Sequence, residues 1–181
     1  DQVLMRRLKR SDFERPSELG EYAVVRHQNG LAKVQWAADF VDQILENDAT
    51  EQVILYAHHR DVVEGLCKAL AIWLPRFIVG GVSLEMRTQI EDEFQKGARR
   101  LIIGNIDAMN LGLTLTAATR IVFAEYSWTP ALNEQAEDRA HRIGQKDSIF
   151  CQYLVLPNSI DEMILNASMT KEEKISKVMD L

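Results

Sequence analysis

The sequence predicts an α/β fold in which helices cover both faces of a parallel β-sheet, giving three α/β/α layers. Two observations lead to this prediction. Short runs of apolar residues, typical of strands buried on both faces, recur along the chain. Between them lie segments in which apolar residues repeat at helical spacing. Strands that alternate with helices of about 10–14 residues form parallel sheets through right-handed crossovers.

The first regular element is expected to be an amphipathic helix over 33–47, because apolar residues recur there three or four positions apart. The apolar run 53–57 predicts the first strand, and a helix is expected over 61–73. Residues 77–79 predict a second strand, which the glycine pair Gly80-Gly81 closes.

In the next part of the chain, Ser83 is expected to cap a helix over 84–96, since a serine oxygen can accept a hydrogen bond from a free N–H group of the first turn. The third strand is expected over 101–103 and ends at Gly104. The last elements are expected to be strand 121–124, a helix over 131–141 opened by Thr129-Pro130, strand 150–156 and a helix capped by Ser159.

Composition and charge exclude several classes of protein. The 181 residues are 46% hydrophobic and 27% charged, which excludes global disorder. No apolar run approaches the roughly 18 residues of a membrane span, so no membrane partner is expected. Cys67 and Cys151 lie far apart, which excludes a disulfide framework and a CxxC metal site. We therefore expect no disulfide partner and an intracellular, reducing location.

The net charge of −6 is unusual for a nucleic-acid-binding module, so any phosphate contact must come from local basic clusters. The candidates are residues 6–10, the pair Arg99-Arg100, and the group Arg139, Arg142 and Lys146. A solvated face is the alternative interpretation of each cluster, and for the first two it is equally favoured. Residues 1–30 lack sustained periodicity and are interpreted as a linker or a severed end of something larger.

Most familiar catalytic motifs are absent from the sequence, which has no GxxxxGK[ST] phosphate loop and no GxGxxG. The segment 80–83 could hold an anion at a helix N-terminus, but a tight turn followed by a cap is the preferred interpretation. The acidic run 91–93 lies within an expected helix and is interpreted as solvent-facing charge. His58 and His59 follow each other at a strand end and point to opposite faces, which is a poor arrangement for one metal. No metal ligand is therefore assigned.

The stretch most suggestive of chemistry is QAEDRAHRIGQ, residues 135–145. On a helix, Gln135, Arg139 and Arg142 would share one face within an arc of roughly 60°. Two arginines near the carboxyl ends of parallel strands could form a fork for a phosphate chain. A surface helix stabilised by i, i+4 pairs would show the same spacing, and the spacing leaves both interpretations open.

These eleven residues resemble the sixth motif of the SNF2 family of ATP-dependent DNA translocases, within helicase superfamily 2. Four further stretches are similar to other family motifs in the right order: VILYAHHRD at 53–61, Gly80 to Ser83 with Arg87 and Phe94, LIIG at 101–104 through 112–118, and Trp128-Thr129-Pro130. The likeness implies a second RecA-like lobe over 31–165, preceded by an inter-lobe segment (1–30) and followed by a C-terminal helix (166–181).

The fifth motif departs from the usual pattern, because the family's Ala-Gly-Gly is replaced by Ala108-Met109-Asn110. This variant, with Phe123-Ala124-Glu125 after it, is more similar to the distant branch that contains the annealing helicases and their bacterial relatives than to nucleosome remodellers. Thr129 stands where the family usually has asparagine.

The resemblance implies a division of labour between two lobes. The first lobe, as in the family, would bind most of the ATP and Mg²⁺. The present chain would supply arginine fingers, Arg139 and Arg142, and would be inactive alone. Gln135, Gly112 and Leu113 would line the nucleotide cleft. The residues that the resemblance implies for contact with double-stranded or branched DNA are Asn105, Asn110, Arg60 and Gly80.

Two alternatives remain open at this stage. One is the equivalent lobe of another superfamily 2 helicase acting on RNA or unwinding DNA, although those helicases favour a Gly-Arg pair where this chain has Asp138-Arg139. The other is an interaction module that kept the fold and lost the chemistry. The expected location is the bacterial cytoplasm or nucleoid, or the eukaryotic nucleus.

Overall fold

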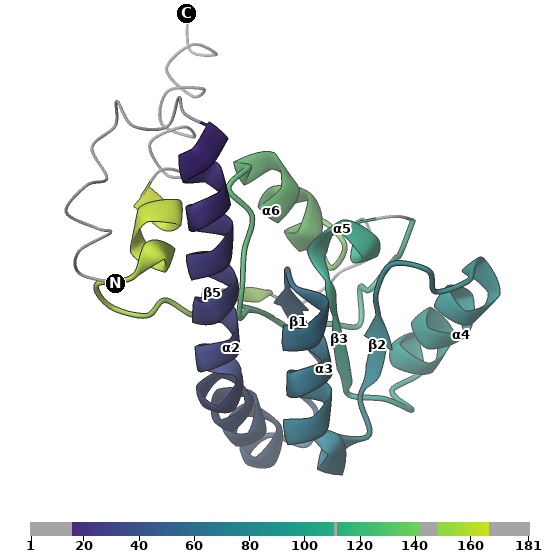
Figure 1. The fold of residues 1–181 in the computed structure, drawn as a ribbon. Coiled ribbons are helices and arrows are strands. Elements are labelled where there is room, and N and C mark those ends of the chain that lie inside the picture. Colours follow the sequence, from purple (N-terminus) through teal and green to yellow (C-terminus); the bar gives the residue numbers. More distant parts are fainter. Residues whose placement is uncertain (1–15, 111, 142–147, 167–181) are drawn as a thin grey trace, which may run out of the picture.

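A five-stranded sheet with strand order β2-β3-β1-β4-β5 forms the centre of the molecule, and every strand pair is parallel (Figure 1). The computed structural model describes residues 16–110, 112–141 and 148–166. The strands are β1 (Val53–Ala57), β2 (Arg76–Ile78), β3 (Leu101–Asn105), β4 (Arg120–Phe123) and β5 (Phe150–Tyr153). All five expected strands are confirmed, although β5 ends at Tyr153 rather than at the expected residue 156.

Helices cover both faces of the sheet, so the expected three-layer α/β/α architecture is confirmed. The helices α2 (Pro16–Asn47) and α3 (Arg60–Ala69) pack on one face against Val53 and Leu55 of β1. The side chains of Ile54 and Tyr56 point to the other face. That face is covered by α4 (Leu84–Gln95), α5 (Ile106–Met109), α6 (Pro130–Glu137) and a helix over 160–166. No helix within these described residues is long and apolar enough to cross a membrane.

Helix α2 begins at Pro16, so the expectation that this helix starts at residue 33 was wrong. The reason lies in the composition of its buried face. Arg26 and Lys33 are buried there, and Gly30 lies between them against Glu125. A buried helix face made of charged residues and glycine shows no apolar periodicity. Hydrophobic spacing therefore could not predict this part of α2.

Helix α6 ends at Glu137, so the helix expected over 131–141 is shorter than predicted. The chain leaves the helix through a tighter turn, in which the Arg139 N–H donates to the Ala136 carbonyl at 3.3 Å and the Ala140 N–H to the Glu137 carbonyl at 3.0 Å. The Arg139 carbonyl accepts a hydrogen bond from the Leu115 N–H at 2.8 Å. Arg139 therefore lies beyond the helix, and the expected common helical face with Gln135 was wrong.

Two shorter elements also differ from expectation. The segment expected as one helix over 61–73 divides into α3 and a 3₁₀ turn, η1 (Ala71–Trp73). The four-residue helix α5 was not expected, and its N-cap is Asn105, whose Oδ1 accepts hydrogen bonds from the Asp107 and Ala108 N–H groups. The Ser83 cap is confirmed, since its Oγ accepts the Met86 N–H at 3.3 Å.

Gly104 permits the close packing of Met109 against β3. A Cβ atom at this position would overlap the Met109 sulfur and would lie 2.7 Å from the Ile78 carbonyl oxygen. We expect Gly104→Ala to lower the free energy of unfolding by about 2–3 kcal/mol, as overpacked cores do, in a denaturant titration. Met109→Ala should relieve only part of this loss, because the Ile78 backbone cannot move aside. Full rescue would contradict the role of the carbonyl.

Candidate functional site at the carboxyl edge of the sheet

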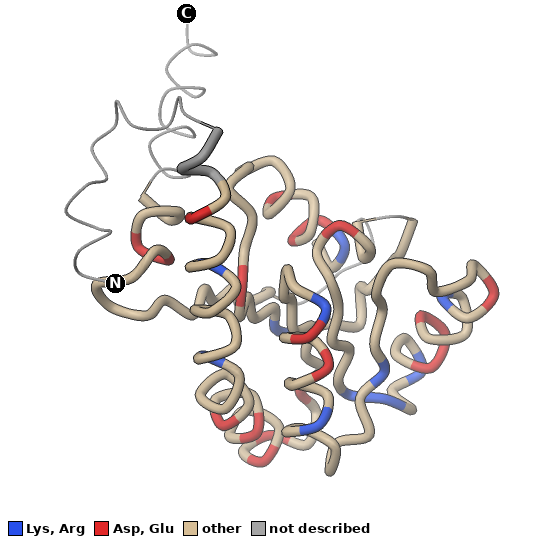
Figure 2. Tube along the Cα trace, in the orientation of Figure 1, with Lys and Arg blue, Asp and Glu red and all other residues tan. Residues whose placement is uncertain are grey.

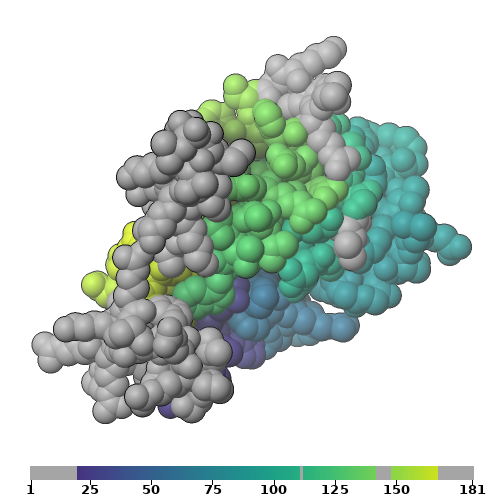
Figure 3. Space-filling model, turned by 90° about the horizontal axis from the view of Figure 1, so that it is seen from above, coloured from purple at the N-terminus to yellow at the C-terminus, as the bar shows by residue number. Residues whose placement is uncertain are grey.

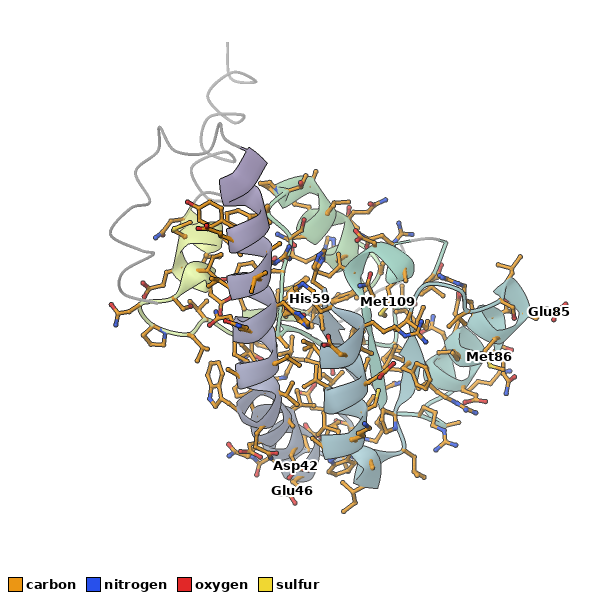
Figure 4. The ribbon with its side chains drawn as sticks, viewed as in Figure 1. Asp42, Glu46, His59, Glu85, Met86 and Met109 are labelled. Atoms are coloured by element: carbon orange, nitrogen blue, oxygen red, sulfur yellow. The ribbon has the colours of Figure 1, made fainter. Side chains whose placement is uncertain are left out.

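The carboxyl ends of the parallel strands meet at one edge of the sheet, where ligands of open α/β folds usually bind. In the stick view, His59 and Met109 lie near this end, whereas Asp42 and Glu46 lie at the opposite end of the molecule (Figure 4). Seen from above, the green part of the chain occupies the middle of this end, with the teal α4 region to one side (Figure 3). Most of the sequence-predicted site residues lie in loops at this edge.

The loop after β1 is fixed by the buried carboxylate of Glu125. Its Oε2 accepts hydrogen bonds from the N–H groups of His58 and His59, both at 2.9 Å, and its Oε1 lies 2.7 Å from His59 Nδ1. Burial alone would raise the pKa of Glu125, but the hydrogen bonds from His59 and His58 outweigh it and hold the pKa below its ordinary value. Glu125 is thus a fixed anion that shapes this loop.

Helix α2 approaches Glu125 closely because Gly30 has no side chain. A Cβ at Gly30 would overlap the carboxylate and lie 2.7 Å from its Cδ atom. Beside it, Arg26 Nη2 donates to the Tyr126 carbonyl at 2.6 Å, and the His27 ring stacks on His59 with centroids 4.5 Å apart. The N-terminal half of α2 is therefore attached to the site edge by polar contacts.

Arg60 begins α3 and is well exposed, with 70% of its side chain accessible. Its Nε donates to Glu64 Oε1 at 3.2 Å, one turn along the same helix. A pair of this kind contributes little to stability. Arg60 therefore presents its guanidinium to solvent at the carboxyl edge.

The loop after β2 contains Gly80, which is exposed, and Gly81, whose φ of 92° favours glycine. Arg87 of α4 holds this loop, because its Nε donates to the Val82 carbonyl at 3.1 Å. The preferred interpretation of a turn followed by a capped helix is confirmed by the Ser83 bond.

Asn105 and Asn110, predicted to face DNA or to couple it to the nucleotide, use their side chains within the protein. Asn105 caps α5, and its Nδ2 also donates to the His58 carbonyl. Asn110 is buried, with its Nδ2 donating to the Leu132 carbonyl at 3.1 Å. The Oδ1 atom of Asn110 has no hydrogen-bond partner in the structure. Both residues lie at the expected edge, but they are held in place by the fold.

Arg139 is buried beneath the same loops, with 8% of the residue exposed. Its Nη2 donates to the Asn110 carbonyl at 2.8 Å and its Nη1 to the Leu113 carbonyl at 3.5 Å. Its Nε is buried without a partner. The structure therefore brings Arg139 together with the loop that contains Leu113, but through main-chain carbonyls rather than through an open fork.

The other residues predicted to contact the nucleotide lie in different environments from that of Arg139. The Leu113 side chain belongs to the core, so this residue can offer a ligand only its main chain. Gly112 is exposed and has a φ of 72°, with open space around its Cα. Gln135 is exposed on α6. Arg142 lies outside the described residues.

The basic pair Arg99-Arg100 lies at the opposite end of the strands, where β3 begins (Figure 2). Arg100 donates to the carbonyls of Leu45, Asp48 and Glu51, so its guanidinium stabilises the fold.

The other acidic and sulfur-containing side chains that the structure describes give no sign of a second site. Hydrogen bonds from Arg76 and Gln89 lower the pKa of Glu93 to about 2. No group of three or more His, Cys, Asp or Glu residues in the described part of the chain is arranged to hold a metal ion. Both cysteines are free.

Sequence reasoning missed the charged residues that build this edge, namely Arg26, Lys33, Glu125 and Asp161. Lys33 Nζ lies 2.7 Å from Asp161 Oδ2 and donates to the Leu154 carbonyl at 3.1 Å. The one available signal was Glu125 itself, an acidic residue directly after a buried strand. A residue in this position lies at the carboxyl edge of the sheet, and a buried carboxylate there needs hydrogen-bond donors or a cation beside it.

The parallel sheet, the capped α5 loop and the buried arginine after α6 define a RecA-like lobe of the helicase type. Residues 36–144 match the family described as "Helicase conserved C-terminal domain", and the chain belongs to this family. Its sequence relatives show that it is a domain of the SNF2 type.

Three comparisons illustrate the likeness. The chain is 39% identical over 132 residues to the Drosophila melanogaster SWI/SNF-related matrix-associated actin-dependent regulator of chromatin subfamily A-like protein 1, covering 71% of this chain and 17% of the relative. It is 36% identical over 140 residues to the human DNA annealing helicase and endonuclease ZRANB3, covering 76% and 13%. The C-terminal part of the Fun30 ATPase domain superimposes with a TM-score of 0.65 at 25% identity, covering 72% and 44%. The chain thus spans a small part of its relatives.

Proposed function

We propose that this chain is the second motor lobe of an ATP-dependent DNA translocase. It supplies arginine fingers to ATP held mainly by an N-terminal RecA-like lobe, forms part of the DNA-backbone track, and is inactive alone. The observation that carries the proposal is the buried Arg139. Its guanidinium fixes the turn after α6 to the Asn110 and Leu113 carbonyls, so the chain leading to Arg142 starts from a rigid point at the carboxyl edge.

The two arginines would then have unequal tasks. An arginine beside the transferred phosphoryl group stabilises the charge that develops there in the transition state. We assign this contact first to Arg142. Arg139 already donates to two carbonyls and would have to exchange at least one of them to reach a phosphate. Its Nε is a further donor without a hydrogen-bond partner, but this atom is buried, so the loop that covers it would also have to rearrange. Exposed Gln135 and the open Gly112 turn would complete the nucleotide side.

The proposed DNA track uses the exposed parts of the edge. Arg60 offers a guanidinium, and the Gly80 turn offers main-chain N–H groups. Asn105, which holds the loop after β1, and Asn110, which bonds to Leu132 of α6, would act by fixing the edge rather than by touching DNA themselves. The names of the relatives refer to chromatin and to DNA annealing, which supports double-stranded or branched DNA as the partner and a DNA-associated location. The carboxylates for Mg²⁺ would come from the first lobe.

A comparison of ATP hydrolysis tests the proposal directly. We expect the 181-residue chain alone to show no turnover above background, with or without duplex DNA, whereas a longer protein with both lobes should be stimulated by DNA. Turnover of the isolated chain at about 1 s⁻¹ or more, an ordinary enzymatic rate, would contradict the two-lobe division. Absence of DNA-stimulated turnover in the two-lobe protein would instead favour an interaction module.

A further inference from the structure

Arg87 joins two neighbouring loops at the carboxyl edge. It lies in the first turns of α4, and its guanidinium donates in two directions. Nε donates to the Val82 carbonyl at 3.1 Å, in the loop after β2, and Nη1 donates to the Ala108 carbonyl at 2.5 Å, in α5 after β3. One half-buried side chain thus holds the Gly80 loop and α5 at a fixed separation.

Helix α5 carries this connection onward. It is only four residues long, and its C-cap residue is Asn110, whose carbonyl accepts the hydrogen bond from Arg139 Nη2 at 2.8 Å. Between the two arginine contacts, Met109 is fully buried against Gly104 of β3. Both arginine contacts therefore lie at the C-terminal end of α5, two residues apart, and the segment 108–110 links the Gly80 loop to the turn after α6.

We propose that Arg87 is a positioning residue that couples the DNA-facing Gly80 loop to Arg139 through α5. The inference rests on the proposed function, since it assigns a role to Arg87 within that motor. Displacement of the Gly80 loop by a phosphate backbone pulls on the Val82 carbonyl, and the guanidinium passes the displacement to Ala108. Because the Ala108 and Asn110 carbonyls are only two residues apart, a shift of the first also changes the position of the second relative to Arg139. Contiguous hydrogen-bonded contacts such as these can carry energetic coupling between two sites.

The test uses Arg87→Met and Arg87→Lys in the two-lobe protein, with ATP turnover measured without DNA and over a range of DNA concentrations. We expect Arg87→Met to lower the ratio of DNA-stimulated to DNA-independent turnover by about tenfold, within the usual range for coupling between sites. The DNA concentration at half-maximal stimulation should change much less. Arg87→Lys should show a similar loss, because one ammonium group cannot reach both carbonyls.

Arg76→Met is the matched control. Arg76 also fixes α4, through hydrogen bonds of 2.6 and 2.8 Å from its Nε and Nη2 to Glu93, but it lies where β2 begins, away from the carboxyl edge. We expect this variant to lower the melting temperature of the protein and to leave the turnover ratio unchanged. An equal fall in the ratio for Arg76→Met and Arg87→Met would show that α4 docking alone matters, and would overturn the proposal.

Two other results would also overturn it. A higher half-maximal DNA concentration with unchanged maximal turnover would make Arg87 a direct phosphate contact, and full activity of Arg87→Lys would show that charge alone suffices. The wild-type protein separates the two proposals. DNA-stimulated turnover in the wild type with an unaltered ratio in both Arg87 variants refutes only the coupling role, whereas a wild type without stimulation refutes the proposed function and the coupling role together.

Discussion

Replacing Arg142 with alanine in the two-lobe protein is expected to lower DNA-stimulated ATP turnover by about 10³-fold, the low end of the effect of an arginine finger. A residue that acts on a nucleotide held by the other lobe should contribute little to the stability of its own lobe. We therefore expect the free energy of unfolding to change by less than about 1 kcal/mol. ATPase activity and thermal melting should be measured on the same preparation. Turnover within about tenfold of wild type would show that the finger assignment is wrong.

Arg139→Ala is the informative companion variant, because the structure gives Arg139 a second role. Its removal leaves the buried carbonyls of Asn110 and Leu113 without their guanidinium donor and opens a space beneath the loop. We expect a loss of stability of about 2–4 kcal/mol in addition to a loss of turnover per folded molecule. Sequence spacing alone predicts an exposed arginine and a negligible stability change. Wild-type melting of Arg139→Ala would contradict the buried position.

The sheet could be predicted from the sequence because each strand is a short apolar run. Strands β1 and β3 are buried along almost their whole length, which explains their continuous apolar composition. The Ser83 cap and the Gly81 turn were also predictable, since both depend on the local chemistry of one residue. Such features can be predicted from the sequence because no tertiary contact favours a different local conformation.

The site was less predictable, because its geometry depends on contacts between distant segments. The motif that includes Gln135 and Arg139 predicts a continuous helix, yet α6 ends at Glu137. The Arg139 carbonyl instead accepts a hydrogen bond from the Leu115 N–H group of a distant loop. Glu125 accepts hydrogen bonds from main-chain groups that lie 66 and 67 positions away in the sequence. No spacing rule within one element can predict such pairs.

The buried ion pair between Lys33 and Asp161 is expected to give the largest stability effect of any single side chain in α2. The two side chains are 1% and 6% exposed, and Lys33 also donates to the Leu154 carbonyl. Burial lowers the pKa of Lys33, while the adjacent Asp161 carboxylate opposes that shift. Lys33→Met removes this cation, and the buried Asp161 carboxylate keeps its hydrogen bond from the Leu156 N–H group. Breaking one side of a buried pair typically costs about 3–5 kcal/mol.

Lys96→Met is the matched control for this prediction, because Lys96 makes an i, i+4 pair with Asp92 at 3.1 Å and is 72% exposed. The same substitution there should change stability by less than about 0.5 kcal/mol. The double variant Lys33→Met, Asp161→Asn should recover part of the loss, since it removes the uncompensated charge while the amide oxygen can still accept from Leu156. Chemical denaturation of all four proteins measures these differences. If Lys33→Met is no more destabilising than Lys96→Met, the ion pair does not hold α2 against the C-terminal segment, and the charged residues of α2 would have to be retained for another reason.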